Sequence, residues 1–415
     1  MKRNRVVVTG MGAITPLGIG VEATWQALLA GRSGVKRITR FDVSDFPTPY
    51  AAEVLDFDPQ KFMDFKEAKR TARFTQFALA ATRQAIQSAA LDLPHEDLTR
   101  VGISMGTAIG GVDIIEEQVT IFREQGLRRI HPTMVPVLLP SSGACHVAIA
   151  FGIKGPTSCP VAACATGIVA VGEALRNLQW GEVDVMIAGG AESAMTALDL
   201  GAFSRIGAMS ACRTEPEKAC RPFDAERDGT IIGEGAAAMV LETWEHAQRR
   251  GAPILAEVLG YGFTEDAYHI AAPEPSGEGA ARAMSRALAD AGIQPREVDY
   301  IVPHGTGTAL NDVSETRACK TVFGEHAYRL AISSNKSMMG HLLGAAGAIS
   351  TVVAILSIDT GILSPTINLE HPDPECDLDY VPNQPRKARV DVAMANAFGF
   401  GGQNATVVVR RPDAA

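Results

Sequence analysis

The feature of this sequence that most constrains its fold is the regular alternation of short apolar runs with longer segments of helical character. The runs have the length and composition of buried strands, and they cover residues 6–8, 101–105, 183–188, 236–241, 254–262, 298–302, 390–395 and 405–410. Helical segments lie between them, and an alanine-rich example covers 277–291. Strands that alternate with helices in this way predict an α/β fold whose sheets are buried between helices.

Composition and charge narrow the class of protein. With 46% hydrophobic and 20% charged residues, the chain has the balance of a globular protein, and 415 residues can form two large halves packed together. The formal net charge of -9 argues against a general nucleic-acid binder. Seven cysteines without a CxxC spacing predict neither a disulfide framework nor a metal site, and they favour a reducing cytoplasm.

The start of the chain is basic, like a signal peptide, but the apolar run that follows holds Gly10 and Gly12 before Pro16. We therefore expect a strand and a tight turn at 9–12 rather than a signal peptide. The glycines also suggest a dinucleotide-binding turn. That interpretation fails because Thr15 stands in place of the third glycine.

The run 342–358 is long and apolar enough to suggest a membrane span. It carries Ser350, Thr351 and several glycines, which favour a helix buried in the core of the protein. We therefore expect no membrane-spanning segment.

The strongest candidate for chemistry is Cys164, which stands between alanines at the predicted start of a buried helix. Small neighbours leave room for a substrate to reach the sulfur. A helix N-terminus also contributes partial positive charge and free N–H groups, which favour a thiolate. A single cysteine of this kind is more often a packing residue, so its function depends on the groups around it.

Three further polar side chains occupy places where the active sites of α/β proteins collect, at the ends of strands and the starts of helices. His304 follows a predicted strand, and Lys336 and His341 precede a predicted helix. Glycines flank these residues and form a further run at 399–402, which lets backbone and ligand approach closely. The sequence therefore predicts that these side chains gather around Cys164.

A weak internal repeat accompanies this pattern. A Gly-Thr pair follows one predicted strand at 106–107 and another at 305–306. Cys164 precedes an apolar run of small residues, as His341 does. These parallels suggest that the fold is duplicated.

Basic side chains gather in two short segments, and by themselves they indicate only a solvated surface. These residues are Lys66, Lys69 and Arg70, and Arg128 and Arg129.

The chain resembles the β-ketoacyl-[acyl-carrier-protein] synthases, a family of condensing enzymes, in four ordered motifs. The motifs are VAACATG at 161–167, PHGTGT at 303–308, SSNKSMMGHLLGAAGA at 333–348 and NAFGFGGQN at 396–404. The likeness extends over essentially the whole chain and is closest to the type II synthases, which elongate fatty acyl chains in bacteria. It implies the thiolase fold, in which two duplicated halves form a five-layered α-β-α-β-α core. We expect these halves to cover residues 1–252 and 253–415.

The resemblance also implies roles for the candidate residues. Cys164 would take an acyl chain from acyl-carrier protein. His304 and His341 would hydrogen-bond the thioester carbonyl of malonyl-carrier protein while carbon dioxide leaves, and the resulting carbanion would attack the acyl group. The backbone N–H groups of Cys164 and Phe400 would form the oxyanion hole.

Other positions match supporting residues of the family. Lys336 would organise the site electrostatically, and Glu315 would support it. The side chain of Phe400 would shield the nucleophile until it is acylated. Ile109 would line the acyl pocket, and Met134 would close it from a partner subunit, because the family forms homodimers.

The partner implied by the resemblance is an acidic acyl-carrier protein, loaded with acyl or malonyl groups. It would dock on the basic residues Lys66, Lys69, Arg70, Arg128 and Arg129. No metal or organic cofactor is implied, because the substrates arrive on the phosphopantetheine of the carrier protein.

Other functions share parts of this pattern. A ketosynthase subunit of a dissociated polyketide synthase has the same chemistry but works with a diverged partner. A non-catalytic chain-length partner has the same fold but lacks the nucleophilic cysteine. A cysteine hydrolase is disfavoured by two histidines with a lysine, and a thiolase by Phe400 where a second catalytic cysteine would stand.

Overall fold

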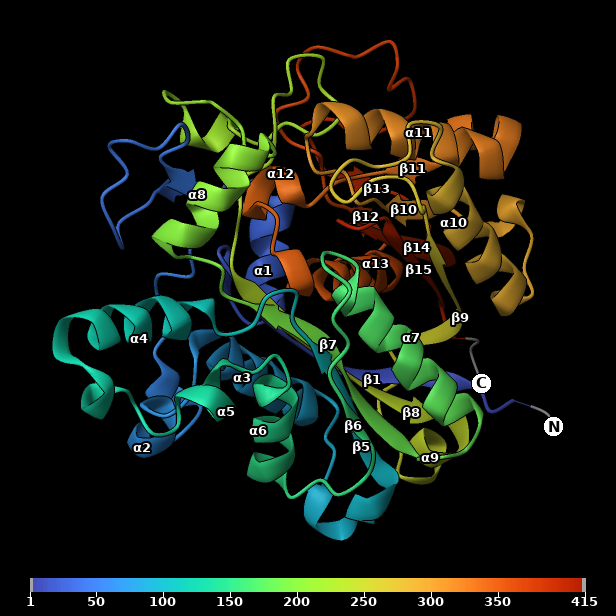
Figure 1. Cartoon of the computed structure of the whole chain (residues 1–415). Helices are drawn as coiled ribbons and strands as arrows, with labels where there is room; N and C mark the ends of the chain where they lie inside the picture. The colour runs from blue at the N-terminus through green and yellow to red at the C-terminus, as the bar shows by residue number, and fades with distance from the viewer. Residues whose placement is uncertain (1–2, 413–415) are drawn as a thin grey trace.

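The computed structural model describes residues 3–412 (Figure 1). Its strands are β1 (Val6–Thr15), β2 (Gly18–Ile19), β3 (Lys36–Arg37), β4 (Tyr50–Ala51), β5 (Val101–Gly106), β6 (Thr157–Ser158), β7 (Val185–Glu192), β8 (Gly235–Thr243), β9 (Ala256–Glu265), β10 (Tyr300–Val302), β11 (Ala331–Ile332), β12 (Ile362–Leu363), β13 (Arg386–Lys387), β14 (Val392–Gly399) and β15 (Gln403–Arg410). Each predicted strand overlaps one of these. Met1 and Lys2 of the basic start, and 413–415, lie outside the described residues.

The α-helices are α1 (Val21–Leu29), α2 (Phe65–Ala68), α3 (Arg73–Ser88), α4 (Val112–Gln125), α5 (Met134–Leu138), α6 (Ser142–Phe151), α7 (Thr166–Gln179), α8 (Ala197–Ile206), α9 (Trp244–Arg249), α10 (Glu278–Ala291), α11 (Ala309–Phe323), α12 (Lys336–Met339) and α13 (Ala346–Thr360). The alternation of helices with strands confirms the predicted α/β class.

The large sheet contains the same strand pattern twice. Its order is β11-β10-β14-β15-β9-β1-β8-β7-β5-β6, with β2 beside β1. In the first half of the chain β5 pairs in parallel with β6 and β7, and β8 pairs antiparallel with β7 and β1. In the second half β10 pairs in parallel with β11 and β14, and β15 pairs antiparallel with β14 and β9. The two halves meet where β1 pairs with β9. The predicted duplication is thus present in the pairing.

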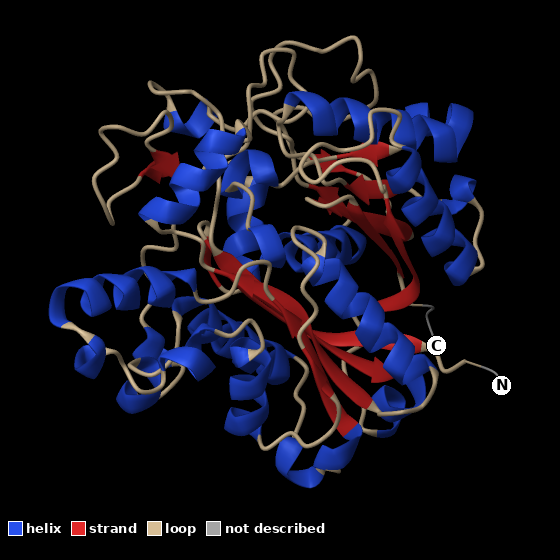
Figure 2. Cartoon of the chain, in the orientation of Figure 1, coloured by secondary structure: helices blue, strands red, loops and turns tan. Residues whose placement is uncertain are grey.

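Helices form three layers around the two halves of the sheet (Figure 2). The helices α7 and α13 lie between the two halves of the sheet. The outer face of the half that contains β5, β7 and β8 is covered by α3 and α6, and the outer side of the half that contains β9, β14 and β15 is covered by α10 and α11. Helices can cover both faces of the sheet because alternate side chains of a strand point to opposite faces. In β7, Met186 and Ala188 belong to the central core, while Val185 and Ile187 belong to the outer core with α3. This is the five-layered thiolase arrangement that the resemblance implies.

The prediction of a tight turn at 9–12 is wrong, because β1 continues through these residues to Thr15. The glycines serve a different purpose. A Cβ atom on Gly10 would lie 2.3 Å from the carbonyl oxygen of Ala85, and one on Gly12 would lie 2.0 Å from that of Ala81. The absence of side chains lets α3 pack directly on the strand.

The second half repeats this contact between a strand and a helix. A Cβ atom on Gly260 would lie 2.4 Å from the carbonyl oxygen of Ala287, and one on Gly262 would lie 2.0 Å from that of Ala283. Strand β9 and helix α10 therefore correspond to β1 and α3.

The run 183–188 was expected to end before Gly189, but β7 continues to Glu192 in register with β8. A Cβ atom on Gly189 would lie 2.0 Å from the carbonyl oxygen of Ala237, and one on Gly190 would lie 2.4 Å from that of Gly344. These glycines again mark close packing rather than a turn.

The apolar run 342–358 covers most of a continuous helical segment, Leu343–Thr360, which is 89% buried inside the protein. It is long and apolar enough to cross a membrane by composition alone. Its burial between the two halves of the sheet confirms the prediction of a core helix.

A buried charged cluster joins β1, β8 and α9 on the side away from the candidate site. Glu242 is fully buried and contacts His246 Nδ1 at 2.5 Å, while His246 Nε2 lies 3.1 Å from Glu96. Arg250 and the hydroxyl of Thr9 also donate to Glu242. Burial opposes the charge of Glu242, but these bonds lower its pKa from 4.5 to about 2. The bond to Glu242 raises the pKa of His246 above 6.5.

We expect Glu242→Gln to lower the free energy of unfolding by about 3–5 kcal/mol near neutral pH, because it leaves buried cations without their carboxylate. The additional free energy of unfolding of the wild type relative to the variant should be present above pH 4.5 and be lost as the pH falls toward about 2. The contribution of His246 should be present below pH 6.5 and be lost as the pH rises through its raised pKa. Denaturant unfolding of both proteins across pH checks this, and a difference that does not vary with pH would contradict it.

Candidate active site

The candidate nucleophile lies in a strained turn just before a buried helix. Cys164 stands two residues before α7 and is 7% exposed. The preceding Ala163 has φ of 46°, a conformation that non-glycine residues rarely adopt. The turn is held by the hydroxyl of Thr166, which accepts a hydrogen bond from the N–H of Ala162 at 2.8 Å. Strain of this kind is common where a protein fixes a reactive side chain.

The structure brings Cys164, His304 and His341 together, although they are far apart in the sequence. The sulfur of Cys164 and one ring nitrogen of each histidine all lie within 4.8 Å of one another. The two imidazole rings meet edge to face, with centroids 5.2 Å apart and an interplanar angle of 83°. All three side chains are buried.

The position of His341 is fixed by its backbone. Its N–H donates to the carbonyl of Ile231 at 2.6 Å, and Ile232 pairs with it as an isolated bridge. Gly340, just before it, has φ of 68°, and a Cβ atom there would lie 2.8 Å from the carbonyl oxygen of Ile231. A glycine is therefore required for the chain to enter the site here.

Both histidines are neutral and have free ring nitrogens. Burial, and after it the positive charge of Lys336, holds the pKa of His304 well below 6.5. Burial and Lys336 do the same to the pKa of His341. Nδ1 of His304 and both ring nitrogens of His341 are buried without a hydrogen-bond partner in the protein. These atoms can therefore bond a ligand in the site.

The expectation that the surroundings of Cys164 favour a thiolate is wrong for the free protein. Burial raises the pKa of this thiol from 9.0 to about 12. The ammonium of Lys336 and the N–H of Phe400 act in the opposite direction, but the loss of hydration dominates. In the free protein the side chain of Cys164 is therefore a thiol at neutral pH.

Lys336 and Glu315 are both buried near the histidines, but no ion pair joins them among residues 3–412. Burial lowers the pKa of Lys336 to about 8 and raises that of Glu315 to about 7. The carboxylate of Glu315 accepts the N–H groups of His304 and Gly305, each at 2.8 Å, and an amide proton of Asn396 at 3.2 Å. It thereby holds the backbone that carries His304.

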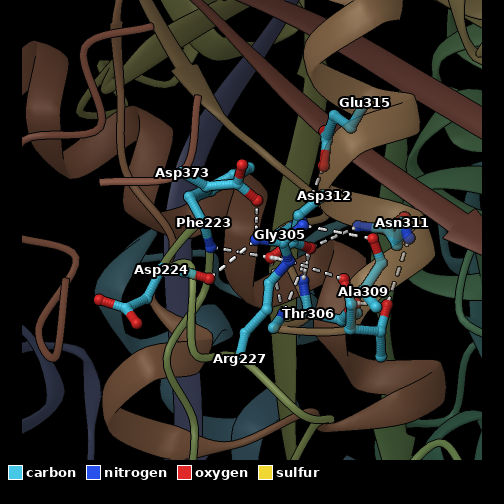
Figure 3. Close-up of polar contacts among 12 residues, drawn as sticks. Phe223, Asp224, Arg227, Gly305, Thr306, Ala309, Asn311, Asp312, Glu315 and Asp373 are labelled. Atoms are coloured by element: carbon cyan, nitrogen blue, oxygen red, sulfur yellow. Dashed lines mark hydrogen bonds and ion pairs between the residues drawn. The ribbon is translucent and has the colours of Figure 1, made fainter. Parts of the chain in front are cut away.

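Asp312 holds the rest of the same loop, and the sequence analysis missed it (Figure 3). It accepts hydrogen bonds from the N–H groups of Phe223, Thr306 and Gly307. It is fully buried and lies one helical turn before Glu315 on α11, so both carboxylates face the loop. That spacing of two acids, directly after a glycine-rich motif, was the signal in the sequence.

Arg227 completes this network by bridging the start of α11 to other loops (Figure 3). Its guanidinium donates to the carbonyls of Thr308 and Ala309 and forms an ion pair with Asp373 at 2.5 Å. It also lies 3.8 Å from Asp312. Nothing in its local sequence indicated this role.

Phe400 stands at the tip of the hairpin between β14 and β15, beside Cys164. A Cβ atom on Gly399 would lie 2.8 Å from the carbonyl oxygen of Ala162, so the hairpin touches the backbone of the nucleophile turn. The phenyl ring is 37% exposed, and its centroid lies 6.3 Å from that of Phe203. The side chain is therefore placed at the boundary between the site and solvent.

A second loop holds this hairpin. The N–H of Gly401 donates to the carbonyl of Ile270 at 2.8 Å, and the N–H of Asp266 donates to that of Gly402 at 2.8 Å. The side chain of Asn404 donates to Asp266 at 2.6 Å. The surroundings of Phe400 therefore depend on the loop that follows β9.

A cavity of about 370 Å³ opens onto the reactive side chains. It is lined by Cys164, His304 and His341 at its base and by hydroxyl, apolar and aromatic residues along its walls, including Thr306, Thr308, Leu310, Ile206 and Phe400. Ile206 and Leu310 are exposed, at 54% and 61%. The cavity therefore has room for a narrow, partly polar chain that enters from solvent.

The remaining predicted residues lie outside this cavity. Ile109 is half-buried and packs on the apolar cluster that contains Cys164. Met134 begins α5, and the five basic residues are exposed on or beside α2 and in the single turn Leu127–Arg129.

Residues 3–247 match the family model for the N-terminal domain of β-ketoacyl synthases, and residues 255–370 match the model for the C-terminal domain. The chain belongs to the β-ketoacyl synthase family. A relative from Coxiella burnetii named 3-oxoacyl-[acyl-carrier-protein] synthase 2 is 48% identical over 411 residues, which are 99% of each chain. One of the same name from Staphylococcus aureus is 45% identical and is matched over the full length of both chains.

Solved structures resemble this β-ketoacyl synthase equally completely. A type II polyketide ketosynthase in complex with its acyl-carrier protein is 36% identical with a TM-score of 0.92, and the match covers 99% of this chain and 100% of that one. A β-ketoacyl synthase from Burkholderia phymatum is 35% identical with a TM-score of 0.91 and the same coverage.

Proposed function

We propose that this β-ketoacyl synthase is a 3-oxoacyl-[acyl-carrier-protein] synthase of type 2. It is an acyltransferase that condenses malonyl-carrier protein with an acyl group on Cys164 and lengthens fatty acyl chains by two carbons. The observation that carries the proposal is the buried group of Cys164 and two neutral histidines within 4.8 Å, at the base of a cavity open to solvent. Full-length relatives of the same name, at 45–48% identity, support it.

The first half of the reaction transfers the acyl group. The sulfur of Cys164 attacks the thioester carbonyl of acyl-carrier protein, and the carrier leaves as a thiol. Because the free cysteine is protonated, its proton must pass to the departing sulfur, and a neutral imidazole nearby can carry it. The N–H groups of Cys164 and Phe400 bind the oxyanion, in keeping with the hydrogen bond from Phe400 to the sulfur.

The second half forms the carbon–carbon bond. Malonyl-carrier protein enters, carbon dioxide leaves, and negative charge develops on the thioester oxygen. Neutral His304 and His341 donate hydrogen bonds to that oxygen, because their free ring nitrogens face the site. The carbanion then attacks the acyl carbon, and the sulfur of Cys164 is released and takes up a proton. Lys336 places positive charge near the reacting groups, while Glu315 fixes the backbone of His304.

The substrates reach this site on the phosphopantetheine arm of the carrier protein, so the proposed reaction needs no separate cofactor or metal. The hydroxyls of Thr306 and Thr308 lie 3.0 Å apart on the cavity wall and provide polar contacts for such an arm. All seven cysteines are free thiols, which agrees with the cytoplasmic location that we predict.

We propose that acyl-carrier protein docks on the basic side chains Lys66, Lys69, Arg70, Arg128 and Arg129. All of them are exposed, and an acidic carrier would be attracted to them although the chain as a whole is acidic. One solved structure similar to this chain contains a ketosynthase with its acyl-carrier protein.

Reversal of two of these charges, Lys66→Glu with Arg128→Glu, is expected to lower kcat/KM for carrier-borne substrates by about tenfold at low salt. The difference should shrink as salt rises, because exposed charges are then screened. Steady-state kinetics across ionic strength checks this, with Arg389→Glu, a change at a position that is mostly exposed, as the control. A loss that is the same at every salt concentration would argue against electrostatic docking.

We also propose that the protein is a homodimer. Large exposed apolar side chains gather on α4, the turn after it, α5 and α6, which contact one another in turn: Ile115, Val119, Phe122, Leu127, Val135, Leu139 and Ile149. A second copy is the natural cover for such a face. Met134 lies within it and could reach the partner's acyl pocket. Sedimentation of wild type and Phe122→Glu tests this, since a monomeric wild type would overturn it.

The predicted halves, 1–252 and 253–415, remain a proposal about domains. The repeated strand pairing supports a boundary near Ala252, between α9 and β9. A short glycine–serine insertion after Ala252 should be tolerated, and loss of folding on insertion there would contradict the boundary.

The polyketide ketosynthase alternative shares the same site chemistry. It is less favoured, because the similar structure described in that way is 36% identical while the type 2 relatives reach 48%. The non-catalytic chain-length partner is disfavoured because Cys164 and both histidines are present together.

The deciding experiment incubates the purified wild type with acyl-carrier protein and measures its intact mass before and after malonyl-carrier protein is added. Formation of an acyl-enzyme, followed by a product two carbons longer, would establish the proposed function. A protein that binds a homologous ketosynthase but takes up no acyl group would instead be a chain-length partner.

A further inference from the structure

Glu192, at the end of β7, is a fully buried carboxyl group with no assigned role in the reaction above. It accepts a hydrogen bond from the hydroxyl of Thr107 at 2.8 Å on one oxygen. On the other oxygen it accepts the N–H of Ala108 at 2.7 Å and the N–H of Gly344 at 3.2 Å. Within residues 3–412 no cation forms an ion pair with it, so these neutral donors stabilise it.

The three donors belong to two segments that are far apart in the sequence, and residues of both segments pack in or against the apolar cluster that contains Cys164. Thr107 and Ala108 lead directly into Ile109, which packs on the apolar cluster around Cys164. The hydroxyl of Thr107 also accepts the N–H of Gly110 at 3.2 Å, so the whole turn is folded around the carboxyl group.

Gly344 follows His341 by three residues and belongs to the segment that carries Leu343 into the cavity. Leu343 has φ of 45° and packs in the cluster with Cys164. A Cβ atom on Gly344 would lie 2.4 Å from the nitrogen of Ala108 and 2.8 Å from the carboxyl oxygen of Glu192. The segment with Thr107 and Ala108 and the segment with Gly344 are therefore in direct contact at Glu192.

We propose that Glu192 is a positioning residue that ties the acyl-pocket wall at Ile109 to the segment carrying His341. It thereby fixes the position of the pocket wall that contacts the acyl chain relative to His341, which stabilises the enolate. This inference rests on the proposed function, and it adds a residue that acts on both halves of the reaction through the backbone rather than by touching substrate.

The connection that Glu192 makes between the two segments depends on hydrogen bonds more than on charge. Burial raises the pKa of Glu192 to about 7, against the bonds from Thr107, Ala108 and Gly344. Both protonation states are therefore present near neutral pH. Glutamine can keep the connections, since its oxygen can accept both N–H groups and its nitrogen can donate to the hydroxyl of Thr107. Alanine removes all of them.

The test compares Glu192→Ala and Glu192→Gln with wild type in two assays. One measures acylation of Cys164 by carrier proteins loaded with short, medium and long chains, and the other measures carbon dioxide released from malonyl-carrier protein. We expect Glu192→Ala to change the ratio of long-chain to short-chain acylation by about tenfold. It should also slow decarboxylation on the order of 10²-fold. Glu192→Gln should keep the chain-length ratio of the wild type.

Glu257→Gln is the control, because Glu257 is also a buried glutamate but lies near the start of β9 in ion pairs with Arg5 and Arg410. It should lower thermal stability and leave the chain-length ratio unchanged. The proposal is overturned if Glu192→Ala, like this control, leaves the chain-length ratio unchanged, or if both Glu192 variants behave alike.

If Glu192→Ala does not fold, Thr107→Val decides the question, because it removes one hydroxyl from the link and keeps the volume of the side chain. A chain-length ratio equal to that of the wild type would then overturn the proposal. A wild type that takes up no acyl group would instead refute the proposed function, so the two failures are distinguishable.

Discussion

Replacement of Cys164 with alanine is expected to reduce condensation by about 10⁴-fold or more, the scale of loss when a covalent nucleophile is removed. The intact mass of the variant should show no acyl adduct after exposure to acyl-carrier protein. The variant should fold normally, because the side chain lies in a cavity wall and alanine already flanks it on both sides. Circular dichroism and thermal melting check the fold.

The pH dependence of acylation gives a second test of this residue. Because burial raises the pKa of Cys164 to about 12, the rate of acylation should still be rising as the pH passes 9.0, the ordinary value for a thiol. Cys159→Ala, which removes another partly buried thiol, is the control and should keep full activity. An acyl adduct on the Cys164→Ala variant would place the nucleophile elsewhere.

Replacement of His341 with alanine is expected to slow malonyl decarboxylation by about 10²–10³-fold, the usual effect of losing one oxyanion donor. Acylation of Cys164 should be less affected, since the thioester oxygen of the first half-reaction is bound by backbone N–H groups. His304→Ala should show the same separation, because in each variant the remaining imidazole beside Cys164 can still carry the proton of the thiol. Mass spectrometry of the acyl-enzyme and release of carbon dioxide measure the two halves independently.

The ionisation of the site sharpens this prediction. Both histidines keep a pKa well below 6.5, so neither should give a pH transition near that value. Transitions near pH 7 are expected from Glu315 and Glu192 and one near pH 8 from Lys336, and the His341→Ala variant should retain them. His326→Ala, at a histidine whose ring bonds the carbonyl of Val298, is the control. Equal loss of both half-reactions in His341→Ala would contradict the assigned role.

Much of this molecule was predictable because the relevant information is local. Apolar runs of strand length, separated by helical segments, indicated the α/β class, and a core helix was distinguishable from a membrane span by its polar and small residues. The positions of Cys164, His304 and His341 at the predicted ends of strands and starts of helices indicated one site. The four motifs then indicated the family.

Local patterns failed where the meaning of a residue depends on what lies against it. Gly10 and Gly12 predicted a turn, but they are strand residues, and because they have no side chains α3 can pack directly against them. The thiol of Cys164 was expected to be activated by its helix, yet burial outweighs the helix and Lys336. Both errors have the same cause, since the distance to a packed neighbour and the loss of hydration do not appear in the sequence.

The sequence by itself determined the class of fold and the family, and it predicted which side chains react, because each of these follows from residue types at fixed spacing. Only the tertiary structure decided which groups hold them in place. Asp312 and Glu192, which the sequence did not single out, are buried carboxyl groups that accept hydrogen bonds from backbone N–H groups of loops. These partners depend on the folded structure, because a buried carboxyl group needs hydrogen-bond donors and packing can supply them from any part of the chain.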